Sequence, residues 1–167
     1  ALSELATTDM SLVADRVGGV QRFVGADVES IIALEPDLCF LASYNRKETR
    51  SLLGDSGIPV YVLRCLDCIE DIRDNVRTVG RAVGADEEAE HLISAMDRKL
   101  ASVADRLPAR QQWPTALVYS RSGWVAGAGT VQTSVLEAAG LRNAAAENGL
   151  TGFLQVSEER VLEIDPD

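Results

Sequence analysis

Two of the three cysteines of this chain stand three residues apart, in the segment Cys65-Leu66-Asp67-Cys68. The C-x-x-C spacing occurs in thiol–disulfide redox pairs and in metal knuckles. Zinc lacks a visible set of ligands, because no second C-x-x-C follows and the single histidine, His91, lies in a predicted helix. Redox chemistry would place the pair where a helix begins, and a helix is expected from Asp67 or Ile69. The alternatives are a thiol–disulfide catalyst and a structural pair, free or disulfide-bonded.

Polar and aromatic residues follow three segments that are expected to be strands, at 38–42, 58–63 and 115–119. In open parallel α/β sheets, ligands bind outside the carboxyl ends of the strands. Arginine suits carboxylates or phenolates, and aromatic faces suit a flat macrocycle or catechol rings. In a chain of formal net charge −10, arginines at three strand ends favour an anionic chelate or haem propionates over a neutral ligand. The candidate ligand-binding residues at these ends are Tyr44, Asn45, Arg46, Arg64, Arg121, Ser122 and Trp124.

A long amphipathic helix is expected between Ala85 and Leu107, because apolar residues recur there every three or four positions. Two strand-then-helix units precede it, and another strand begins after Pro114. This alternation predicts an α/β fold with parallel pairing through right-handed crossovers. The predicted division is part of an N-terminal lobe at 1–84, a linking helix at 85–112, and part of a C-terminal lobe at 113–167.

Shorter helices are expected from Asp27, over 48–53 and 69–83, from Thr130 or Thr133, and from Ser157. Tyr61 and Tyr119 lie within predicted strands and are expected in the core. Trp113 is expected to hold the long helix against its lobe, and His91 to be solvated. Cys39, inside an apolar run, is expected to behave as a small buried hydrophobe.

The composition excludes several classes of function. A net charge of −10 without a basic stripe argues against binding to nucleic acid. No apolar run approaches the roughly 20 residues that span a bilayer. Catalysis is not expected, because no nucleophile stands beside a base and Gly123–Gly129 lacks the G-x-G-x-x-G order. Neither a metal site of the protein's own nor a cofactor is expected.

Five segments in order resemble the substrate-binding proteins of ABC importers for ferric siderophores, haem and cobalamin. They are Ala26–Asp37, Gly57–Val62, Gly123–Thr130, Val135–Ala144 and Val156–Leu162. The resemblance implies two Rossmann-like lobes with parallel sheets, joined by one long α-helix, with both lobes incomplete in this chain. It also implies capture of an iron chelate, haem or cobalamin in a cleft between the lobes, so that the ligand carries the iron or cobalt.

The same resemblance implies partners and further residues. Phe153 would belong to a fourth ligand-facing loop, and Glu48 would dock on the ABC permease, with its C-terminal counterpart expected after Asp167. The location would be periplasmic or extracellular, either free or lipid-anchored. Exposed sheet edges would be covered by exchange of elements in a homodimer. The alternatives are a redox protein using Cys65 and Cys68, and a sensor or partner-binding module on the same scaffold.

Overall fold

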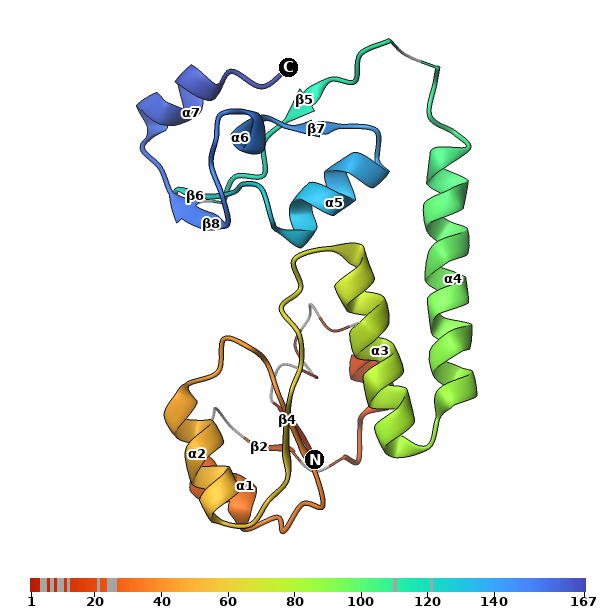
Figure 1. The fold of residues 1–167 in the computed structure, drawn as a ribbon, viewed down its shortest axis with the longest axis vertical. Helices are drawn as coiled ribbons and strands as arrows, with labels where there is room; N and C mark the ends of the chain where they lie inside the picture. Colours follow the sequence, from red (N-terminus) through yellow and green to blue (C-terminus); the bar gives the residue numbers. More distant parts are fainter. Residues whose placement is uncertain are drawn as a thin grey trace. The chain divides into compact units, whose positions relative to one another are not determined.

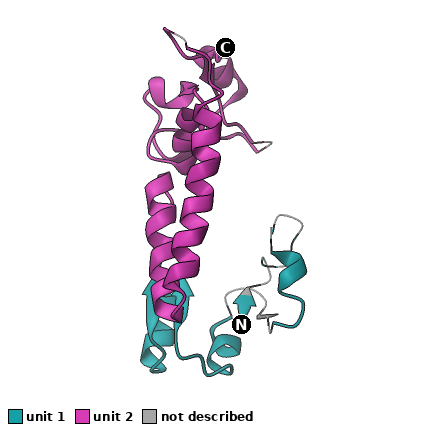
Figure 2. Cartoon of the chain, turned by 90° about the vertical axis from the view of Figure 1, so that its right-hand side faces the viewer, with its two compact units in different colours: residues 1–65 teal, residues 66–167 magenta. Residues whose placement is uncertain are grey.

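The computed structural model describes residues 1–3, 6, 8, 11, 13–20, 22–23, 27–109, 111–120 and 122–167. Its contacts group the chain into two compact units, Ala1–Cys65 and Leu66–Asp167, which Figure 2 shows in different colours. The long helix therefore groups with the C-terminal strands. The predicted division into lobes at 84/85 and 112/113 stays a prediction.

The first unit consists of short parallel strand pairs and helices (Figure 1). Its elements are β1 (Leu2–Ser3), η2 (Ala14–Arg16), β2 (Arg22–Phe23), α1 (Val28–Ile32), β3 (Cys39–Leu41), α2 (Lys47–Asp55) and β4 (Val60–Val62). Strand β1 pairs in parallel with β2, and β3 in parallel with β4. The parallel pairing expected of the two apolar strands is thus confirmed, although both strands are shorter than predicted.

The core of the first unit lies between α1, α2 and the β3–β4 sheet. It contains Ile31, Leu41, Leu53 and Ile58, all buried. Helix α1 begins where predicted, because the Asp27 carboxylate accepts hydrogen bonds from the N–H groups of Glu29 and Ser30. The Ser30 hydroxyl also donates to this carboxylate and, above the other causes, lowers the pKa of Asp27.

Tyr61 is not a core residue, which corrects the prediction. It is 42% exposed and packs edge-to-face against Phe40, with 6.0 Å between the ring centroids. Side chains alternate between the faces of a strand, and the core of this unit covers the face that carries Cys39, Leu41 and Val60. Phe40 and Tyr61 are register partners on the other face. An apolar run does not reveal how far each face of its sheet is covered.

The second unit begins with two helices and continues as a mixture of short strands and helices. Its elements are α3 (Ile69–Val83), α4 (Asp86–Ala104), β5 (Thr115–Ala116), β6 (Trp124–Ala126), α5 (Val131–Ala138), β7 (Arg142–Asn143), α6 (Ala144–Glu147), β8 (Phe153–Gln155) and α7 (Glu158–Ile164). Helix α3 has the predicted bounds. Helix α4 is unbroken, and ends three residues before the predicted Leu107.

The pairing in this unit is mixed. Strands β5 and β7 are parallel as expected, whereas β6 and β8 are antiparallel. Strands β7 and β8 and helix α6 lie between the helix expected from Thr130 or Thr133 and the helix expected from Ser157, where no regular element was predicted. Tyr119 was predicted to be buried in a strand over 115–119, but β5 ends at Ala116. Tyr119 forms only an isolated antiparallel β-bridge with Val125 and is 44% exposed. The prediction that Tyr119 is a core residue is therefore wrong.

Helices α3 and α4 form an antiparallel hairpin and lie side by side in Figures 1 and 2. Gly84, at φ 71°, ends α3; its N–H donates to Arg81 O and the next N–H donates to Gly80 O, which is a Schellman motif. Arg73 on α3 contacts Asp97 on α4 at 2.6 Å, and this hydrogen bond is the largest cause that raises the pKa of Arg73. The pair ties the two helices together.

None of the helices in the described ranges is long and apolar enough to span a membrane.

Capping and close packing position the C-terminal elements. Thr130 and Ser157 cap α5 and α7, with Ser157 as predicted and Thr130 one of the two predicted alternatives. The ring of Trp113 lies against Gly140, where an added Cβ would be 2.7 Å from the ring. The Asp167 carboxylate accepts from the backbone N–H and the hydroxyl of Thr115, which lowers the pKa of Asp167. These contacts fix the segments that flank β5.

Candidate functional site

The predicted residues of the first unit lie on two loops that contact each other. One loop, Ser43–Arg46, follows β3, and the other, Arg64–Cys65, follows β4. Because these strands are parallel, both loops leave the same end of the sheet. The thiol of Cys65 donates to Ser43 Oγ at 3.3 Å. The structure therefore brings the two predicted loops of this unit together.

The side chains on these loops differ in their exposure to solvent. Tyr44 is 85% exposed, and Arg46 and Arg64 are also exposed. Asn45 instead closes its own loop, since the N–H of Ala42 donates to Asn45 Oδ1 at 2.7 Å and the N–H of Asn45 donates to Ala42 O at 3.0 Å. Tyr44 is thus presented to solvent by a turn that Asn45 holds.

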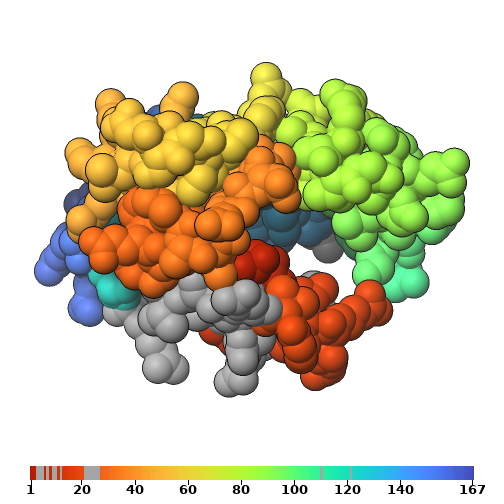
Figure 3. Space-filling model, turned by 90° about the horizontal axis from the view of Figure 1, so that it is seen from below, coloured from red at the N-terminus to blue at the C-terminus, as the bar shows by residue number. Residues whose placement is uncertain are grey.

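Arg46 is the N-cap residue of α2, and Glu48 lies in the first turn of that helix. A carboxylate in the first turn interacts favourably with the helix dipole. Both side chains are exposed, and the gold-coloured atoms of α2 are open to view at the upper left of Figure 3. The predicted docking carboxylate therefore has an accessible position next to a predicted ligand-binding loop.

In the second unit, the turn between Ser120 and Trp124 holds the next predicted residues. The N–H of Ser120 donates to Trp124 O at 2.9 Å, and the N–H of Trp124 donates to Ser120 Oγ at 3.3 Å. Gly123, at φ 81°, gives the turn a conformation that L-residues rarely adopt. Ser122 is exposed. Arg121 lies outside the described residues.

Trp124 and Phe153 share one face of the antiparallel pair β6–β8. Trp124 pairs with Gln155 and Ala126 pairs with Phe153, so the two aromatic residues are diagonal neighbours. Trp124 is 45% exposed and Phe153 58% exposed. On the opposite face, Val125 is buried. This aromatic face, which consists of Trp124 and Phe153, presents two rings to solvent from the paired strands β6 and β8.

Gln155 is a residue of this site that the sequence analysis missed. Its side-chain amide donates to Ser122 O at 2.9 Å and so fixes the predicted turn to β8. The segment of β8 was expected to be a loop, so the sequence analysis provided no reason to place Gln155 beside Ser122. The alternation of Phe153, Leu154 and Gln155 was the available signal, but three residues are too few to identify a strand from its period.

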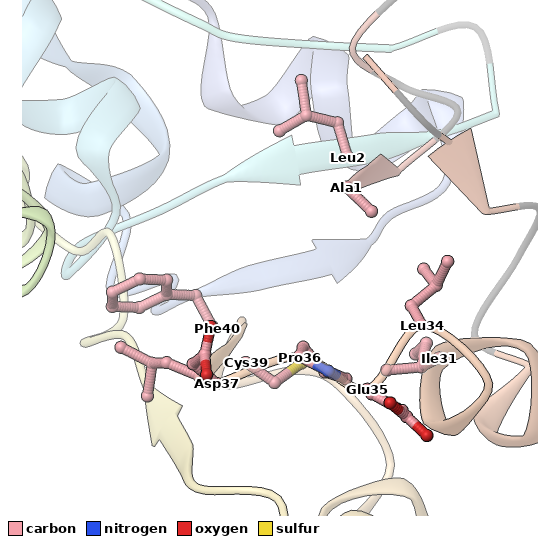
Figure 4. Close-up of a pocket in the computed structure, with 10 residues that line it drawn as sticks. Ala1, Leu2, Ile31, Leu34, Glu35, Pro36, Asp37, Cys39 and Phe40 are labelled. Carbon is pink, nitrogen blue, oxygen red and sulfur yellow. The ribbon is translucent and has the colours of Figure 1, made fainter.

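Two cavities in the described part of the chain lie elsewhere. A pocket of about 490 Å³ in the first unit has mostly apolar walls, and Figure 4 shows its lining from α1 and β3. It contains Pro36 and Asp37, at the end of β3 opposite to Tyr44. An apolar groove of about 300 Å³ lies between α3 and α4 and includes Leu92 and Met96. None of the predicted ligand-binding residues that the structure describes lines either cavity.

Comparison with known proteins identifies the family. Residues 7–167 match the family model described as "Periplasmic binding protein". The chain belongs to the periplasmic binding protein family. The recognised resemblance is thereby confirmed. Members of this family are binding proteins rather than enzymes, and they act outside the cytoplasm.

Several individual proteins are similar to this chain. A cobalamin-binding protein of Halobacterium salinarum is 31% identical over 143 residues, which cover 84% of this chain and 39% of the relative. The periplasmic haem-binding protein RhuT of Roseiflexus sp. RS-1 is 26% identical, has a TM-score of 0.71, and matches 83% of this chain and 55% of its own. A periplasmic haem-binding protein of Pseudomonas aeruginosa is 24% identical, with a TM-score of 0.78, over 96% of this chain and 60% of its own.

These matches confirm the predicted α/β class with Rossmann-like lobes. They also show that the chain spans about two fifths of the length of its curated relative. Within the described part of the chain, no group of three or more His, Cys, Asp or Glu residues is placed to hold a metal ion.

Proposed function

We propose that this chain is part of an extracytoplasmic substrate-binding protein that captures cobalamin, haem or a ferric siderophore and delivers it to an ABC permease. The observation that carries the proposal is the 31% identity to a cobalamin-binding protein over 84% of the chain. Because the chain spans 39% of that relative, the complete protein would supply further ligand contacts. The similarity to the haem-binding protein RhuT supports haem as one of the proposed ligands.

The exposed aromatic residues support a ligand with a large flat surface. Tyr44 stands on a strand-end loop of the first unit, and Trp124 and Phe153 form the aromatic face of the second unit. Rings held on turns and ribbons lose little conformational entropy when they bind a corrin or porphyrin plane. Arg46 and Arg64, which are exposed on the two loops that follow β3 and β4, are suited to anionic groups of such a ligand, including haem propionates. Each unit thus carries exposed aromatic residues that are suited to this class of ligand.

Replacing Trp124 with alanine is expected to weaken ligand binding about tenfold, since loss of a stacked aromatic ring costs about 1–1.5 kcal/mol beyond its buried area. Phe153→Ala is expected to weaken binding less, because the ring is smaller. Cyanocobalamin, haemin and a ferric catecholate are titrated against the chain by isothermal calorimetry. The control is Leu162→Ala, which removes an equally apolar side chain that is 78% exposed on α7.

The control variant should retain the affinity of the unmodified chain. If Trp124→Ala and Leu162→Ala both leave the affinity unchanged, the aromatic face does not bind ligand. If none of the three probes binds to the chain or to a full-length protein that contains it, the proposed ligand class is wrong.

Glu48→Ala is expected to reduce ligand uptake at least fivefold without changing ligand affinity, because the proposed role of this carboxylate is docking to the permease. Uptake is measured in cells that produce the full-length protein with its permease and ATPase. Asp55→Ala, which removes another exposed carboxylate from the opposite end of α2, is the control. Equal uptake by both variants would show that Glu48 is not a docking residue.

A further inference from the structure

The C-x-x-C segment is not used by the proposed function. Its two cysteines are free in the structure, and they lie in the chain segment that contains the boundary between the two compact units, after Cys65. We propose that Cys65 and Cys68 form a redox-sensitive disulfide that closes this linker. The bond would join residues three positions apart, so it requires a local bend of the chain and no particular arrangement of the units.

The surroundings of Cys65 make it the thiol that reacts first with an oxidant. The residue is exposed at the end of β4, and its thiol donates to Ser43 Oγ. A thiol at an exposed position reacts readily with a small disulfide, because access limits thiol–disulfide exchange. Cys65 is therefore suited to form the first mixed disulfide.

Cys68 is held in a different setting, at the N-cap of α3. Asp71 Oδ2 accepts hydrogen bonds from the N–H groups of Asp67 and Cys68, both at 3.1 Å, and lies 3.2 Å from Cys68 Sγ. These bonds fold the short segment around one carboxylate. They also place a proton acceptor, Asp71 Oδ2, next to the Cys68 thiol.

The reaction balances as two thiol–disulfide exchanges. The Cys65 thiolate attacks one sulfur of a disulfide such as glutathione disulfide, which gives a mixed disulfide and releases one glutathione thiolate. The Cys68 thiol then loses its proton to Asp71, and its sulfur attacks Cys65 Sγ. The Cys65–Cys68 bond forms, and the second glutathione leaves as a thiolate that takes up the proton. One disulfide is reduced for each disulfide formed.

Cys39 provides an internal control. It lies in β3, is half-buried, and packs against the core of the first unit, where burial raises the pKa of its thiol. A higher pKa leaves less thiolate for exchange. Oxidation is therefore expected to consume the thiols of Cys65 and Cys68 and to leave that of Cys39.

The test equilibrates the full chain with an excess of glutathione disulfide, traps the remaining thiols with an alkylating reagent, and maps them by mass spectrometry. The proposal expects a monomer that has lost 2 Da, with the Cys65–Cys68 bond in one peptide and Cys39 alkylated. Cys68→Ser should stop at a glutathione adduct on Cys65. Asp71→Asn should slow release of the second glutathione at least fivefold, because the proton acceptor is lost.

Trypsin provides a second readout, at the exposed bond after Arg64. Oxidation is expected to slow this cleavage at least threefold and to leave cleavage after Arg46 unchanged. The proposal is overturned if all three thiols stay free, if the disulfide involves Cys39 or a second chain, or if oxidation leaves cleavage after Arg64 unaltered. Because the test contains no ligand, its failure leaves the proposed function standing.

Discussion

Replacing Asn143 with alanine will lower the free energy of unfolding of the Leu66–Asp167 unit by about 2–4 kcal/mol, the range expected when a buried polar network loses both a helix cap and its donors. Asn143 is 3% exposed. Its amide nitrogen donates to Ala126 O at 2.8 Å and to Thr133 Oγ1 at 2.9 Å. Its amide oxygen accepts from the N–H groups of Ala145 and Ala146. One side chain thus joins β6, α5 and α6.

The large effect follows from what alanine leaves behind. Ala126 is only 1% exposed, so its carbonyl would lose the Asn143 donor in a place that water does not reach. An unsatisfied buried acceptor costs more than an average hydrogen bond contributes. Because β6 also carries Trp124, loosening of this network should weaken the aromatic face as well as the fold.

Urea denaturation followed by tryptophan fluorescence measures this effect in one unit. Both tryptophans of the chain, Trp113 and Trp124, belong to the second unit. Asn143→Ser should recover about 1 kcal/mol relative to alanine, because serine caps α6 but is too short to replace the amide donor. Asn148→Ala, which removes an exposed amide that donates to Ala144 O, should cost less than about 1 kcal/mol. Equal losses for Asn143→Ala and Asn148→Ala would contradict the network.

The helices show how far local sequence determines the fold. Apolar residues at helical spacing and a glycine at the end are sufficient to bound α3 at Ile69 and Val83, because both signals lie within the helix itself. The β6–β8 pair is different. Ala126 pairs with Phe153 across two helices and another strand, and each partner strand is three residues long. Pairing between distant short strands depends on the packing of the whole unit, which no local pattern records.

The candidate site shows the same difference between features that local sequence determines and features that it does not. The sequence correctly places the Tyr44 and Arg64 loops at neighbouring strand ends, because an apolar run fixes where a strand ends and parallel pairing brings the ends together. It does not predict that Gln155 holds Ser122, or that Asn45 is occupied by its own backbone turn. Those are hydrogen bonds set by exact loop conformation. Whether the predicted side chains touch ligand stays a prediction.

Gly80→Ala will destabilise the α3–α4 hairpin by about 1–3 kcal/mol, the usual cost of overpacking, although alanine is a better helix former than glycine by about 1 kcal/mol. Gly80 is buried on α3, and an added Cβ would stand 2.5 Å from Ala89 Cβ on α4 and 3.0 Å from Ala85 O. The Gly84 turn keeps the helices together here, because it returns the chain directly into α4. The hairpin therefore has no space for the methyl group.

Gly54 is the matched control, because it also lies inside a helix, α2, and an added Cβ would meet nothing within 4 Å. Gly54→Ala should stabilise α2 by up to about 1 kcal/mol. Amide hydrogen exchange followed by mass spectrometry measures the stability of α2 and of α3 in each variant. Stabilisation of both helices would contradict close packing of Gly80.

Adding Ala89→Gly to Gly80→Ala removes the opposing methyl group, so the double variant should be more stable than the sum of the single changes predicts. Such a coupling would show that the stability of the α3–α4 hairpin depends on how closely the two helices approach each other, and not on helix propensity alone.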